Sequence, residues 1–154
     1  MTTTSYRVSR CTDPRNAPQE IFWAEINGDK YLVRNEFVSS VREMVPVPAL
    51  KDAIGTIKAL LKRVEQCNAV DPKDVVNVAR DRELFELRVQ AQAFNLLLRF
   101  YETEPANAPH TIVMLKAHAK DLAAPHLMND EQNREIDEAS RRRTLGMKNQ
   151  WGIK

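Results

Sequence analysis

Residues 84–120 read LFELRVQAQAFNLLLRFYETEPANAPHTIVMLKAHAK and decide the fold. Three stretches rich in aliphatic and aromatic residues are typical of β-strands: 84–89, 93–101 and 111–120. The connections between them, one rich in glutamine and one containing prolines, are short enough for direct reversals of the chain. The sequence therefore predicts an antiparallel meander of three strands.

Helical patterns flank this meander on both sides. Residues 36–45 predict a short helix, which Pro46 and Pro48 interrupt because proline lacks a backbone donor. A second helix is indicated by one apolar stripe with helical spacing: Leu50, Ile54, Ile57, Leu61 and Val64. After the meander, residues 129–146 carry acids in the first turns and arginines in the last, which matches a helix dipole, and Gly146 is placed as a stop.

The N-terminal part of the chain divides into two segments. Residues 1–19 are polar, contain two prolines and show no period, so we expect a flexible arm that could order on a partner. The next stretch, EIFWAEINGDKYLVRNEF, places aromatic and β-branched residues on both sides of Asn27 and Gly28, which predicts a hairpin. With residues 147–154 as a C-terminal tail, these boundaries leave one domain over 20–146.

Composition narrows the class of protein. The 154 residues are 43% hydrophobic and 29% charged, which fits one domain with a stable core. Two cysteines and an N-terminus without an apolar leader favour a cytoplasmic location, and no apolar run approaches the roughly 20 residues that cross a bilayer. A net charge of +2 permits contact with nucleic acid without demanding it, and no metal or cofactor site is predicted.

Strand alternation predicts which side chains share a face of the sheet. By strict alternation, one face of the third stretch carries Ile112, Met114, Lys116, His118 and Lys120. Glu86 and Arg88 share a side of the first stretch, and Arg99 shares a side with Tyr101 in the second. Because short connections bring these strands together, we expect Arg88, Lys116 and His118 to form a basic cluster on an open sheet face.

Each of these residues also has a structural interpretation. Arg88 can form a surface ion pair with Glu86, and Arg99 can brace Glu86 or Glu102. The imidazole of His118 suits proton transfer near neutrality, although a lone histidine is more often a hydrogen-bonded structural residue. Tyr101 can stack on a base or fill the sheet.

Several motifs, in this order, resemble the HigB-like, phage-derived branch of the RelE-like toxin superfamily. Glu86-Leu87-Arg88 resembles the ELR strand of that family, Arg99-Phe100-Tyr101 its arginine-aromatic strand, and Ile112 to Lys120 its third core strand. Residues 134–142 resemble its closing helix. The resemblance covers residues 37–143 and implies an α+β fold, in which an N-terminal hairpin and two helices pack on an antiparallel sheet and a C-terminal helix follows.

The resemblance also implies a function. Members of this family are toxins of toxin-antitoxin pairs that cleave mRNA in the ribosome, without a metal, by helping a ribose 2′-hydroxyl attack the neighbouring phosphate. Arg88, Arg99, Lys116 and His118 are the implied catalytic residues. Further RNA contacts are hypothesised for Lys58, Lys62, Lys120, Arg141 and Arg142, although cations on a helix surface or at a helix C-terminus are usually solvated. The implied partners are an antitoxin, the ribosome and mRNA.

The sequence departs from the family where relatives commonly place a histidine and then an aromatic residue before paired lysines. Here the chain reads Lys116, His118, Lys120 and Asp121. This departure motivates an alternative hypothesis, a non-catalytic protein that keeps the fold and binds a host or partner protein. A gyrase-directed toxin is a third possibility, because related folds include such toxins.

Overall fold

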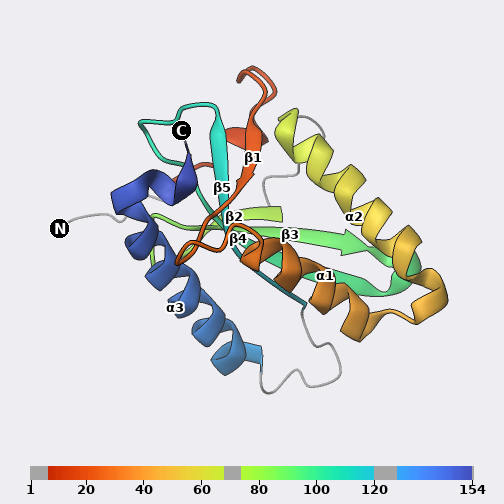
Figure 1. Ribbon diagram of the computed structural model, residues 1–154. Helices are drawn as coiled ribbons and strands as arrows, with labels where there is room; N and C mark the ends of the chain where they lie inside the picture. The colour runs from red at the N-terminus through yellow and green to blue at the C-terminus, as the bar shows by residue number, and fades with distance from the viewer. Residues whose placement is uncertain (1–6, 68–73, 120–127, 154) are drawn as a thin grey trace.

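A computed structural model describes residues 7–67, 74–119 and 128–153. Within these residues the chain is an α+β protein with a five-stranded mixed sheet and three α-helices (Figure 1). Two helices lie on one face of the sheet and the third lies on the other, so the sheet is the middle layer of three. In the same residues, no helix is both long and apolar enough to span a bilayer.

The sheet confirms the predicted meander. Its strands are β1 (Glu20–Trp23), β2 (Val75–Asn77), β3 (Phe85–Ala91), β4 (Leu96–Thr103) and β5 (Thr111–Ala119), in the order β1-β5-β4-β3-β2. Neighbouring strands from β2 to β5 are antiparallel. Strand β1 instead pairs with β5 in parallel, so the expected antiparallel sheet is in fact mixed.

The predicted N-terminal hairpin is wrong beyond its turn. Asn27 and Gly28 do form a tight turn, with φ values of 51° and 80° and a bridge between Ile26 and Asp29. The chain then enters helix α1 (Leu32–Met44) instead of a second strand. Val33, Phe37 and Val41 recur every fourth residue and are all buried on the helix, and this helical period prevails over the local β propensity.

Helix α2 (Leu50–Glu65) agrees with the prediction. It follows the break at Pro46 and Pro48, where residues 47–49 form a short 3-10 turn. Ala53, Ile57, Leu61 and Val64 are buried, and Leu50 and Ile54 pack beside them. Together α1 and α2 cover one face of the sheet, where the aromatic rings of Trp23, Phe37 and Phe100 pack against one another.

Helix α3 (Met128–Gly146) covers the opposite face and ends at the predicted glycine (Figure 1). A side chain at Gly146 would collide with the indole of Trp151, which folds back over the helix end. Trp151 is buried and its Nε1 donates to the carbonyl oxygen of Arg143 at 3.2 Å. The second core, between α3 and the sheet, therefore includes part of the C-terminal tail.

Part of the segment for which flexibility was expected contacts the domain. Ser9 and Cys11 are buried, and the Arg10 guanidinium donates to four carbonyl oxygens of the β4–β5 connection: Glu104, Pro105, Ala108 and Thr111. Cys11 and Cys67 are both free thiols. Burial raises the pKa of Cys11 to about 12, which keeps this thiol protonated.

Candidate functional site

Three of the predicted catalytic residues form a row across the sheet. Arg88 on β3 lies directly opposite Arg99 on β4, and Arg99 lies directly opposite His118 on β5. Directly opposed residues on neighbouring strands are close enough for their side chains to interact. The expectation from alternation in β3 and β4 is therefore confirmed, and the row faces α3.

The face assigned to β5 needs a correction. Ile112 and Met114 belong to the core under α1 and α2, whereas Lys116 and His118 contact residues of the α3 side. The pairing register shifts between Tyr101 and Glu102, and Leu115 is left without a partner on β4. Because of this irregularity, the residues of β5 before and after Leu115 follow opposite alternations of the two sheet faces. Regular strand alternation does not predict such a change.

Glu86 forms ion pairs with both arginines of the row. Its Oε1 atom lies 2.8 Å from Arg88 Nε and 3.4 Å from Arg99 Nε. Gln132 of α3 donates to the other carboxylate oxygen of Glu86 at 2.9 Å. In this conformation Arg88 and Arg99 are therefore ion-pair partners of Glu86, as their structural interpretation predicts.

The surroundings of His118 favour the neutral form of its imidazole. Its ring stacks on Tyr101 with centroids 5.6 Å apart, and Nε2 lies 3.3 Å from the Tyr101 hydroxyl. Burial lowers the pKa of His118 below its ordinary value, with Glu135 opposing this effect and Arg99 adding to it. The Nδ1 atom is buried and has no protein partner among the described residues. A neutral ring of this kind can accept a proton.

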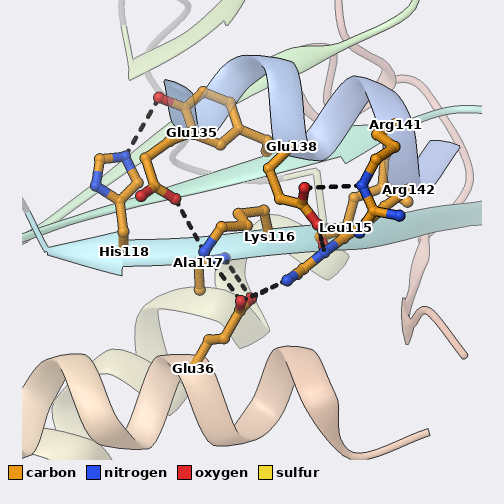
Figure 2. A network of polar contacts seen from close by, with 10 residues as sticks. Glu36, Leu115, Lys116, Ala117, His118, Glu135, Glu138, Arg141 and Arg142 are labelled. Carbon is orange, nitrogen blue, oxygen red and sulfur yellow. Dashed lines mark hydrogen bonds and ion pairs between the residues drawn. The ribbon is translucent and has the colours of Figure 1, made fainter. Parts of the chain in front are cut away.

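Lys116 is fixed between two carboxylates instead of being free to bind a phosphate. Its Nζ atom lies 2.9 Å from both Glu36 of α1 and Glu135 of α3. Arg142 of α3 also binds Glu36, with both terminal nitrogens 2.7 Å from the carboxylate oxygens. Figure 2 shows Glu36 reaching across from α1 to meet Lys116 and Arg142 at the edge of β5.

These contacts also satisfy the backbone of β5 beyond the end of β1. Arg142 donates to the carbonyl oxygen of Leu115 at 2.9 Å, and Glu36 accepts from the Ala117 N–H at 3.4 Å (Figure 2). An unpaired strand edge would otherwise expose these groups. We call Glu36, Lys116, Glu135, Glu138 and Arg142 the edge clamp.

The expectation of an open basic face is wrong. Helix α3 covers this side of the sheet, and the side chains of Arg99 and Lys116 are only 7% and 13% exposed. Arg88 is 42% exposed and remains accessible at the margin of α3. The apolar residues Ile136 and Ala139 of α3 bury the sheet here, which the polar sequence of this helix did not indicate.

The hypothesised RNA contacts do not gather around this row. Lys58 and Lys62 line a separate groove of about 430 Å³ between α1 and α2, the α1–α2 groove. It has an apolar floor that includes Trp23, Phe37 and Leu61, and Arg34 lies on its rim. Arg141 pairs with Glu138 on the surface of α3, Arg142 is buried in the edge clamp, and Lys120 lies outside the described residues.

A second groove, of about 760 Å³, does adjoin the row. This β3-edge groove is lined by residues of α2, β3 and β4, among them Arg63, Arg88, Gln90, Gln92 and Arg99. Sequence reasoning missed Arg63 because it is one of several cations off the apolar stripe of α2, and spacing alone does not distinguish it from the others. It likewise missed Glu36 and Gln132, which approach the row from helices.

Among the described residues, no group of three or more histidine, cysteine, aspartate or glutamate side chains is arranged to hold a metal ion. The chain matches no family model, no curated protein and no solved structure at the level taken as significant. The residues and their geometry therefore carry the functional argument.

Proposed function

We propose that this chain is a RelE-like toxin of a toxin-antitoxin pair, acting as a ribosome-dependent mRNA endonuclease. The observation that carries the proposal is the row of Arg88, Arg99 and His118 across three adjacent strands. Two guanidinium groups beside a neutral imidazole supply charge for a phosphate and an acceptor for a proton. The order of motifs resembling the HigB-like branch supports the same conclusion.

In the proposed reaction, His118 takes the proton of a ribose 2′-hydroxyl as its oxygen attacks the adjacent phosphorus. The bond from phosphorus to the 5′-oxygen breaks, which leaves a 2′,3′-cyclic phosphate, and the departing oxygen takes a proton from solvent. Arg88 and Arg99 stabilise the extra negative charge on the phosphate oxygens, because guanidinium groups bind these oxygens in pairs.

The covered conformation has a consequence for this mechanism. Gln132 and Glu135 of α3 contact Glu86 and Lys116, so a phosphate reaches His118 only after the N-terminal half of α3 moves away. The conformation described above is therefore the inactive one. We propose that binding to the ribosome with its mRNA draws α3 off the sheet.

The proposal includes an antitoxin as the neutralising partner. The α1–α2 groove suits a protein segment, since its floor is apolar and Arg34 and Lys58 on its rim form no ion pair with any described residue. Unpaired cations around an apolar floor complement an acidic amphipathic segment. An antitoxin bound there leaves the row untouched and would act by holding α3 closed or by blocking the ribosome.

The decisive test compares variants in a purified translation system. Arg88→Ala is expected to lower the rate of mRNA cutting on translating ribosomes by about tenfold or more, because a phosphate contact is lost. Arg15→Ala is the matched control, since Arg15 is exposed and pairs only with Asp13 beside it. Absence of cutting by the intact protein would remove the proposal.

A second candidate is favoured by helix α3, which covers Arg99 and Lys116 while the α1–α2 groove on the other face stays open. In this alternative the chain is a non-catalytic binding protein that uses the α1–α2 groove. It predicts that expression leaves bacterial growth and mRNA intact while Lys58→Glu abolishes a complex with a partner protein. Cutting that depends on Arg88 would exclude it.

A further inference from the structure

The β3-edge groove is open even while α3 covers the row. Strand β2 pairs only with Phe85 to Leu87, and no strand among the described residues pairs with the outer edge of Arg88–Ala91. The groove follows this edge, with Thr56, Leu60 and Arg63 of α2 on one side and Arg99 on the other. It therefore leads from the surface of α2 to the row.

Cations outnumber carboxylates in and around the groove. Its lining holds Arg63, Arg88 and Arg99 with one carboxylate, that of Asp74, and Glu86 pairs with both Arg88 and Arg99. Arg63 is exposed and forms no ion pair with any described residue. Arg88 donates to Glu86 through Nε alone, and its other nitrogens donate to no described group. This excess of guanidinium groups fits a chain of phosphates.

The remaining lining is mixed, with apolar side chains such as Leu60 and Leu97 beside two glutamines. Gln90 and Gln92 are exposed, and their amides carry both donors and acceptors that can bind base edges. The groove is also continuous with Arg88, so a strand lying in it would reach the phosphate-binding end of the row.

We infer that the β3-edge groove binds single-stranded RNA, with Arg63 contacting a phosphate a few nucleotides away from the one held by Arg88. This inference rests on the proposed function, because it assigns the path of the RNA that the row would cut. It adds a binding residue on α2 and separates RNA binding, which the closed conformation permits, from cutting, which requires α3 to move.

Helix α2 provides a matched pair of variants. Arg63 and Lys51 are both exposed cations of this helix, but Arg63 lines the β3-edge groove and Lys51 lines neither groove. Arg63→Ala and Lys51→Ala therefore remove the same charge from the same element. Only the first removes it from the inferred RNA path.

The experiment measures binding of a short fluorescent single-stranded oligoribonucleotide to the full chain by anisotropy, at several salt concentrations. Arg63→Ala is expected to weaken binding about fivefold and to reduce the slope of log affinity against log salt by about one, as loss of one phosphate contact does. Lys51→Ala is expected to leave both quantities unchanged.

Equal effects of the two variants, or no RNA binding by the unaltered chain, would overturn the inference. Tighter binding of an acidic peptide of equal charge, competing with RNA, would make the groove a protein-docking surface and would overturn it as well. The cutting assay keeps the two proposals apart: cutting with no effect of Arg63→Ala refutes only the groove, and Arg63-dependent binding without cutting refutes only the endonuclease.

Discussion

Glu86 and Glu102 are both buried carboxyl groups, but their surroundings differ. Glu86 has Arg88, Arg99 and Gln132 around it, whereas neither oxygen of Glu102 has a hydrogen-bond partner within bonding geometry among the residues that the structure describes. Glu102 faces the core beneath the N-terminal segment, and its burial, followed by the proximity of Glu104, raises its pKa well above the ordinary value of 4.5. Glu102 therefore remains protonated at pH values where an exposed glutamate is ionised.

This difference predicts how stability varies with pH. In the unfolded chain Glu102 ionises above about pH 4.5, while in the folded chain it stays protonated, so its contribution to stability is full below that pH and is lost as pH rises. Glu102→Gln removes the ionisation. The denaturation midpoint of this variant should match that of the unaltered chain below pH 4.5 and exceed it at about pH 8.

Urea unfolding at the two pH values checks this prediction. Glu43→Gln is the control, because Glu43 is exposed on α1 and its replacement should leave the pH dependence unchanged. An equal shift of the midpoint at both pH values would show that Glu102 is not buried as a neutral acid.

The sequence predicted which side chains of β3 and β4 lie in the row. Arg88 and Arg99 share a face because β3 and β4 follow regular alternation. Lys116 was expected on the same face of β5 as Ile112 and Met114, but the unpaired residue Leu115 reverses the alternation between them. No local pattern in the sequence marks this irregularity. The binding of Lys116 by Glu36 joins residues 80 positions apart, which no short pattern encodes.

Helix α3 is the element on which the state of the site depends. The helix is polar along most of its length. It is held on the sheet by the apolar residues Ile136 and Ala139 and by the ion pairs of the edge clamp. Glu36 is the centre of this clamp because it binds Lys116 and Arg142 at once, and both of these cations are largely buried. Without Glu36, Lys116 would keep Glu135 and Arg142 would keep Glu138, but buried donors of both cations would lose their acceptor.

We therefore predict that Glu36→Ala destabilises the protein by about 3 kcal/mol, because Lys116 and Arg142 then remain buried without their shared carboxylate. Urea denaturation followed by circular dichroism measures the change. Asp137→Ala is the control, since it breaks the exposed pair between Arg80 and α3 and should alter the midpoint little. Similar midpoints for the two variants would show that the clamp does not stabilise α3.

The elements themselves were predictable where one period dominates. The stripe of α2 and the runs of β3, β4 and β5 gave the correct type and order. Strand β2 was missed because three residues are too few to show a strand period. The start of α1 and the parallel pairing of β1 with β5 depend on contacts across the fold, so a local hairpin signal at Asn27 and Gly28 was misleading.

The net charge of +2 is distributed unevenly over the protein. Carboxylates pair with the cations under α3, whereas each groove keeps cations without an ion pair among the described residues: Arg63 in the β3-edge groove, and Arg34 and Lys58 in the α1–α2 groove. The grooves lie on different elements, one along the edge of β3 and one between α1 and α2. This arrangement suits a protein that holds RNA on one side and a neutralising partner on the other.

The ends of the mRNA fragments made by the purified chain on translating ribosomes show whether the row of Arg88, Arg99 and His118 directs a 2′-hydroxyl against the neighbouring phosphate. We expect a 2′,3′-cyclic phosphate on the upstream fragment and a 5′-hydroxyl on the downstream one, with both products nearly abolished by His118→Ala. A 3′-hydroxyl paired with a 5′-phosphate, or intact mRNA, would contradict this mechanism.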